Sequence, residues 1–371
     1  MSKQLTKIGL AWFGTVGIGA VSVGVLVAAC YNPPDKNTQT TTDQDVAAGK
    51  CAATPGGFPS PNCDNSDNLC EQTGCTTIPE ATCGSTSTCM PLSNNTGKST
   101  IDLRIRKLNV VAPPPLADNI IRSTVLNPNI DLNEPQCTEK GAGSFNWLFR
   151  VERTAGTDTG KLETGGAPPS PDPRGKGFCF YNHKAGDIQV NSAKADVTFT
   201  GDTFTSGAIE KLNVPIFLRG DVKNVIILPL SDVIIQNVTL SENNNCVGRF
   251  DLKALDESCG EDPSVCTKWK TAAALGGYIT LEEADKVDVV DLTQSLCVLL
   301  TKADGGSDAK GIKRCPRDAD NKLNLNDAQK GDYCSNPKGP GGCRDSFWLT
   351  ATFAASAVTI NDGAGVVECN P

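Results

Sequence analysis

Apolar and polar residues alternate along much of the chain after residue 94, with the period of two that is typical of half-buried β-strands. Ile101, Leu103 and Ile105 alternate with charged residues, and four large apolar residues alternate between Phe145 and Val151. Gly, Asn and Pro separate the segments, which predicts a mainly β domain with an antiparallel, sandwich-like arrangement. Further short candidates are residues 178–181, 197–200, 214–218, 225–228, 233–240, 347–353 and 357–360.

One region departs from this alternation and predicts two or three short helices between about 262 and 302. It begins with an Asp-Pro pair, which suits a helix start, and the glycines at 276–277 suit the end of that helix. Thr280 and Glu283 then have the spacing of a capping box, and a second apolar run covers 292–300. We expect these helices to pack on the sheet.

The segment 51–98 is rich in cysteine and poor in large apolar residues. Such a segment cannot form a core of its own, so we expect disulfides within it to hold it together as an irregular N-terminal module. The β-rich domain then covers 99–371. The six cysteines of the module are Cys51, Cys63, Cys70, Cys75, Cys83 and Cys89.

The cysteines of the β-rich domain suggest structural disulfides as well. Cysteines near each other in sequence form the smallest disulfide loops. This favours the pairings of Cys259 with Cys266 and of Cys334 with Cys343. No Cys-x-x-Cys occurs, and this argues against zinc ribbons and thioredoxin-like redox motifs. The remaining cysteines fall mostly at ends and loops of the predicted elements, among them Cys137 and Cys179.

The composition indicates the cellular compartment of the protein and argues against one class of partner. Seventeen cysteines in 371 residues are too many for a reducing cytoplasm, so the protein is expected to be exported. The formal net charge is −8, and no cluster of basic side chains interrupts this acidic balance. Nucleic acid is therefore not expected as a partner, because phosphate binding needs clustered cations.

The first thirty residues explain the export. Lys3 and Lys7 precede an uncharged stretch that ends in Val27-Ala28-Ala29-Cys30. This tetrad resembles the lipobox of bacterial lipoproteins, and the mature part is loosely similar to uncharacterised cysteine-rich lipoproteins of Gram-negative bacteria. The resemblance implies a signal peptide over 1–29, cleavage before Cys30, and lipid on the Cys30 sulfur. An uncleaved membrane span and an ordinary secretory signal are the alternatives.

If Cys30 carries lipid, sixteen cysteines remain, and these can pair without leaving a free thiol. Several acyl chains anchor a protein stably at a membrane. Residues 30–50 contain almost nothing to bury, and we interpret them as the lipidated cysteine and a flexible tether. Tyr31 differs from the Asp that marks inner-membrane retention in enteric lipoproteins, which favours the outer membrane of the cell envelope.

One acidic segment allows both a structural and a functional interpretation. Asp318, Asp320 and Asn324 lie in a segment that resembles a calcium loop over its first three positions only. Lys322 and Leu323 stand where an oxygen ligand and a glycine belong in an EF-hand. A solvated acidic loop is the favoured interpretation, and a weak calcium site the other. No other cofactor is indicated.

The only histidine, His183, lies in an expected turn after a strand, so a surface position is favoured over a catalytic base. Trp147, Trp269 and Trp348 are interpreted as core residues.

These observations favour a membrane-anchored envelope lipoprotein with a structural or binding role and without catalytic machinery. Its expected partners are the membrane, through the lipid, and another envelope protein or a surface glycan. A glycan hydrolase that uses two carboxylates is one alternative and requires both in one cleft. An adhesive or ligand-binding β module is the other, and it requires an exposed aromatic or apolar patch.

Overall fold

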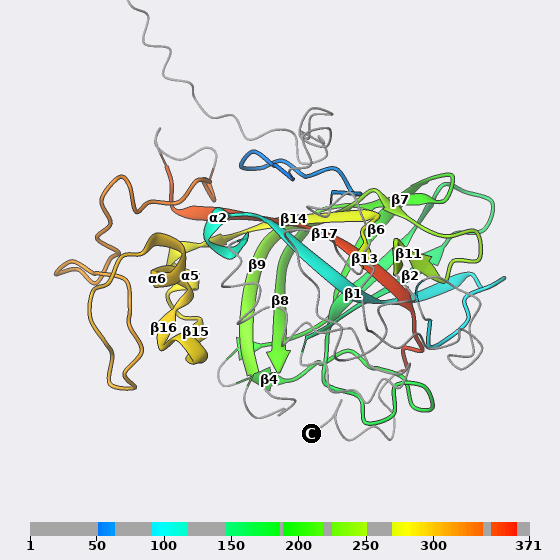
Figure 1. Ribbon diagram of the computed structural model, residues 1–371, viewed down its shortest axis with the longest axis horizontal. Helices are drawn as coiled ribbons and strands as arrows, with labels where there is room; N and C mark the ends of the chain where they lie inside the picture. Colours follow the sequence, from blue (N-terminus) through cyan, green and yellow to red (C-terminus); the bar gives the residue numbers. More distant parts are fainter. Residues whose placement is uncertain are drawn as a thin grey trace, which may run out of the picture. The chain divides into compact units, whose positions relative to one another are not determined.

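The computed structural model of the protein describes residues 51–63, 89, 91–117, 145–185, 188–217, 225–250, 269–336 and 343–361, and strands dominate them (Figure 1). All of them belong to one unit, Pro33–Pro371. The main sheet consists of β1 (Thr100–Ala112), β2 (Asn146–Arg153), β3 (Thr159–Ala167), β6 (Ala193–Thr200), β7 (Thr203–Ser206), β8 (Ile209–Phe217), β9 (Val225–Gln236), β10 (Val238–Thr239), β11 (Cys246–Val247), β14 (Ala273–Thr280) and β17 (Ser346–Ala357).

Short elements complete the described part. Three two-stranded ribbons pair β4 (Lys184–Ala185) with β5 (Ile188–Gln189), β12 (Arg249–Phe250) with β13 (Trp269–Lys270), and β15 (Asp288–Val289) with β16 (Gln294–Ser295). The helices are α2 (Pro114–Ala117), the 3-10 helix η6 (Val290–Leu292), α5 (Leu281–Ala284) and α6 (Leu296–Thr301). None of these described helices has the length and apolar character needed to traverse a bilayer.

The main sheet is antiparallel and curls back on itself. Its strand order is β10-β7-β6-β3-β2-β1-β17-β14-β9-β8, with β11 added beside β17. The curl brings β8 against β3 and β6, and β7 against β9. Between β7 and β9 the backbone N–H of Ile235 donates to Ser206 Oγ at 2.9 Å. The predicted mainly β, antiparallel and sandwich-like class is confirmed.

The core lies inside the curl because alternate residues of each strand point there. Ile101, Leu103 and Ile105 of β1 are buried, as their alternation predicts. The rings of Phe149 on β2 and Phe353 on β17 stack inside the curl with centroids 5.3 Å apart. The same alternation places the intervening charged residues of β1 on the opposite face of the sheet.

The first predicted helix is wrong wherever the structure describes it. Its expected last residues form β14, which pairs with β17 on one side and β9 on the other. Gly276 does not end a helix: a Cβ there would lie 2.8 Å from the Phe58 ring and 2.9 Å from the Trp348 ring. The glycine is thus a close-packing position of a central strand. The expected start at 262 lies outside the described residues.

The two later helices are confirmed as short elements. Thr280 caps α5, and its hydroxyl oxygen accepts the backbone N–H of Glu283 at 3.2 Å, as the capping-box spacing predicts. Ser295 caps α6 in the same way through Val298. Figure 1 shows both helices together at one end of the sheet, where β14 enters α5 directly.

The described parts of the N-terminal cysteine-rich segment are disulfide-bonded, as predicted, and they pack on the sheet. A disulfide between Cys51 and Cys63 closes a small ring. From this ring Phe58 meets Trp348 edge to face, with centroids 5.7 Å apart. Cys89 pairs with Cys246 of β11, so the expectation that the first six cysteines pair among themselves is wrong for Cys89. The segment has too few apolar residues to form its own core, so the neighbouring sheet supports it.

Candidate functional site

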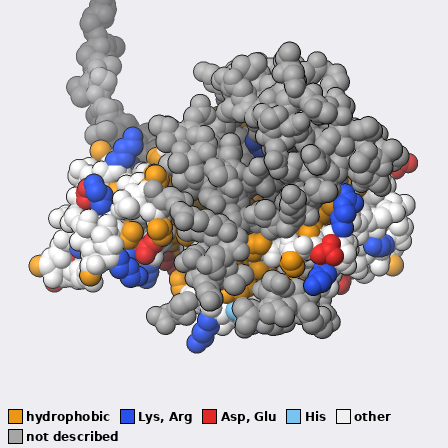
Figure 2. Space-filling view, turned by 60° about the horizontal axis from the view of Figure 1, so that its bottom comes forward, with side chains coloured by type: hydrophobic (Ala, Val, Ile, Leu, Met, Phe, Trp, Pro, Cys, Tyr) orange, Lys and Arg blue, Asp and Glu red, His pale blue; other side chains and the backbone are white. Residues whose placement is uncertain are grey.

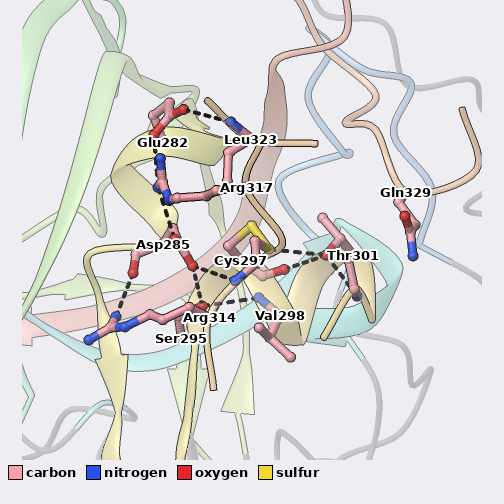
Figure 3. Close-up of a disulfide and its surroundings, with 12 residues drawn as sticks. Glu282, Asp285, Ser295, Cys297, Val298, Thr301, Arg314, Arg317, Leu323 and Gln329 are labelled. Carbon is pink, nitrogen blue, oxygen red and sulfur yellow. Dashed lines mark hydrogen bonds and ion pairs between the residues drawn. A yellow bond between two sulfur atoms is a disulfide. The ribbon is translucent and has the colours of Figure 1, made fainter. Parts of the chain in front are cut away.

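A buried carboxylate organises the helical end of the sheet (Figure 3). Asp285, directly after α5, has only 4% of its surface exposed. Its Oδ1 accepts the Ser295 hydroxyl at 2.8 Å and the backbone N–H of Cys315 at 2.9 Å. Its Oδ2 accepts a guanidinium N–H of Arg317 at 2.9 Å. One side chain thereby joins α5, the cap of α6 and the loop that follows α6.

Two arginines of that loop extend the network outward. Arg317 also pairs with Glu282 at 3.0 Å. Arg314 lies 2.6 Å from Asp288 and 2.8 Å from Asp308. These hydrogen bonds and charges hold the pKa of both guanidinium groups above the ordinary arginine value, against the opposing effect of burial. Both arginines stay charged and serve as cross-links between loop and helices.

The disulfide beside Asp285 decides what this cluster can do chemically. Cys297 in α6 and Cys315 are bonded and buried. Their sulfur atoms and an Asp285 oxygen lie within 4.8 Å of one another, the spacing of a metal-ligand group. A disulfide sulfur is not a thiolate ligand, however, and Asp285 already accepts three hydrogen bonds. The arrangement is therefore suited to stapling the loop onto α5 and α6, not to binding an ion.

The predicted calcium residues lie in the same loop, in a turn that accounts for their spacing. Asp318 Oδ1 accepts the backbone N–H groups of the residues two and four positions later, Asp320 and Lys322. Asp308 does the same ten residues earlier, and both turns have a positive φ at their fourth residue. Asn324 donates its backbone N–H to a carbonyl. The Asp318 oxygen thus serves an Asx turn, and calcium binding stays a prediction.

A cluster of aromatic side chains on the outer face of β14 and β17 was not foreseen from the sequence. The Tyr333 ring lies between those of Tyr278 and Trp348, with centroid distances of 5.2 and 5.1 Å. Next to it, burial raises the pKa of the Asp332 carboxyl, whose Oδ1 accepts the Trp348 backbone N–H at 2.9 Å. These residues connect the loop before Cys334 to the sheet.

Titration at high pH tests this packing. Burial, aided by Asp232 and Tyr278, raises the pKa of Tyr333 to about 12. The unfolded chain loses this proton at the ordinary, lower tyrosine pKa, so the stabilisation is complete below that value and is lost as pH rises toward 12. We expect Tyr333 to ionise after Tyr181 and Tyr278, the other two tyrosines of the described part of the chain. Near-ultraviolet absorbance of tyrosinate measures this, and Tyr333→Phe should remove the highest step; loss of a lower step would contradict the assignment.

The candidate disulfides have mixed outcomes. Cys334 and Cys343 are bonded with Cα atoms 5.2 Å apart, which confirms that pairing. Cys179 is disulfide-bonded too. The pair Cys297 and Cys315 was missed, although these two are consecutive cysteines along the chain. Four predicted positions lie outside the described residues, namely the lipidation site Cys30 and the disulfide candidates Cys137, Cys259 and Cys266.

The remaining candidates from the sequence are the histidine and the three tryptophans. His183 is half-buried after Tyr181, with their rings 5.4 Å apart, so it lies closer to the protein than the expected surface turn. Trp147, Trp269 and Trp348 are buried, as predicted. No family model matches the chain, and neither a curated protein nor a solved structure is significantly similar to it.

Proposed function

We propose that this chain is a lipoprotein of the bacterial cell envelope, held on a membrane by acyl chains on Cys30. In this proposal the β-rich domain acts by structure or by binding another surface component, and the outer membrane is its place. The observation that carries the proposal is the state of the cysteines. All nine in the described part of the chain are disulfide-bonded, as expected in an oxidising compartment.

The ring closed by Cys51 and Cys63 is attached firmly to the sheet, which suits the end of a tether. Cys63 closes the ring with Cys51, and its carbonyl oxygen accepts a hydrogen bond from Asn109 of β1 at 3.1 Å. The same oxygen accepts the hydroxyl of Thr352 on β17. A tether that ends at residue 50 would therefore join the sheet at a firmly held position.

The distribution of charge supports a partner other than a polyanion. On the face shown in Figure 2, basic side chains of the described residues lie in small scattered groups, several of them beside acidic ones. The whole chain carries a formal net charge of −8. A surface of this kind suits a protein or an uncharged glycan better than a phosphate backbone.

Replacement of the anchor residue tests the proposal. The full chain and its Cys30→Ser variant are produced in a Gram-negative host supplied with an alkyne fatty acid. We expect label and membrane association in the wild type and loss of the label in the variant, because a hydroxyl cannot form the thioether. Gel fluorescence of membrane and soluble fractions measures both.

The double variant Cys51→Ser/Cys63→Ser is the matched control, because it removes two cysteines and one disulfide without touching the lipobox. It should keep the label. Unchanged labelling of Cys30→Ser would refute lipid on Cys30, and membrane fractionation that needs no label in either chain would leave an uncleaved membrane span as the explanation.

A further inference from the structure

One outward face of the sheet carries charges of alternating sign. We call it the charged face. Strand register places its residues in two rows, the first across β1, β2, β3 and β6 and the second across β2, β3 and β6. The first row is Asp102, Arg150, Glu163 and Lys194, and the second is Glu152, Lys161 and Asp196. Each charge therefore has an opposite charge beside it in its row. On β2, β3 and β6 it also has an opposite charge two residues away along its own strand.

The charged face is open to solvent at Lys194 and along its second row. The side chains of Lys161, Lys194 and Asp196 are 72, 77 and 78% exposed, whereas those of Asp102, Arg150 and Glu163 are only 14, 25 and 25% exposed. A hollow of about 440 Å³ lies over β2, β3 and β6 and is lined mostly by these charged residues. The ion pairs inside the face include Arg150 with Asp102 at 2.8 Å and Lys194 with Glu163 at 3.9 Å. The Arg150 pair is mostly covered, whereas Lys161 pairs with Asp196 in full view of the solvent. Exposed pairs of that kind contribute little to folding, so their charges remain available to a partner.

The alternation makes this face complementary to itself. A two-fold axis that runs along the strands between β2 and β3 sets β2 of one copy over β3 of the other, and β1 over β6. Arg150 then faces Glu163 of the second copy, and Glu152 faces Lys161. Asp102 faces Lys194 in the outer columns. All of these contacts join opposite charges, which is the requirement for an isologous interface.

We propose that two copies of this protein associate through the charged face. Strand spacing and rise give the two rows an area of roughly 400 Å² per copy, about half of that in a standard stable interface. The association is consequently weak and sensitive to salt, and lipid-anchored copies would favour it by their high local concentration. The proposal goes beyond the anchor, and its test in detergent works whether or not Cys30 is acylated.

Two complementary charge reversals provide the test. Full-length chains with two different affinity tags are co-produced, extracted in a non-ionic detergent at low ionic strength, and captured through one tag. Wild-type copies should capture one another. Lys161→Glu should fail to capture itself, because two new pairs of like charge face each other across the axis, and Glu152→Lys should fail likewise. We expect a loss of about tenfold in each case.

The mixture of the two variants is the decisive sample. Lys161→Glu on one copy and Glu152→Lys on the other restore opposite charges across the axis, although within each chain the two residues stay alike in sign. Capture should return only in this mixture, and Lys211→Glu, which reverses a charge of an exposed pair outside this face, should not reduce self-capture. Equal capture by the single variants, or no recovery in the mixture, would overturn the proposal.

Discussion

Asp285→Ala is expected to destabilise the protein by about 3 kcal/mol or more, because it leaves buried donors without an acceptor. The Ser295 hydroxyl and the Cys315 backbone N–H both donate to one Asp285 oxygen, and both residues are buried. Water cannot replace the carboxylate at a site that is only 4% exposed. Urea unfolding followed by circular dichroism, with disulfides intact, measures the change.

A second carboxylate of the same region serves as the control. Asp304 accepts the Gly306 backbone N–H at 2.9 Å and pairs with Lys313 at 2.6 Å, but it lies at the surface. Asp304→Ala should leave the midpoint close to that of the wild type, since water can take over both contacts. Equal midpoints for the two variants would mean that Asp285 does not hold the helical end together.

Gly248→Ala is the second substitution expected to have a large effect, again about 3 kcal/mol. Gly248 lies between β11 and β12 with φ of +74°, a conformation that side chains rarely adopt. An added Cβ would lie 2.1 Å from the carbonyl oxygen of Lys270 and 3.1 Å from the Ala354 Cβ. A backbone carbonyl cannot move aside as a side chain can, so β12 and β13 would have to separate.

Gly201→Ala separates the two causes. Gly201 has a φ of +62°, but an added Cβ there would meet nothing within 4 Å. It should therefore cost only the conformational part, about 1 kcal/mol. The difference in thermal midpoint between the two variants then reports the steric overlap at Lys270. If both variants melt at the same temperature, the close approach of Gly248 to Lys270 is not rigid.

The strands and helix caps could be predicted from the sequence because local rules determine them. Alternation at Ile101, Leu103 and Ile105 identified β1, and the spacing of Thr280 and Glu283 identified α5. Gly276 misled the helix prediction because its role depends on the rings of Phe58 and Trp348, which come from distant parts of the chain. A single sequence does not distinguish a glycine that ends a helix from a glycine that makes room for a packed aromatic ring.

Most contacts of the candidate site could not be predicted from local sequence patterns. Asp285 contacts Cys315 and Arg317, about thirty residues away, and no spacing pattern announces such a contact. The charged face arises only once strand register is known, because its rows combine one residue from each of several strands. Cys334 with Cys343 was predictable because the loop between them is short.

The disulfide between Cys89 and Cys246 has a consequence for how the protein responds to a protease. It joins residues 157 positions apart, and β1 to β10 all lie between them. A single cut anywhere in that span leaves two fragments bound to each other through sulfur. A nicked molecule would therefore migrate at its full mass on a denaturing gel until a reductant separates the pieces.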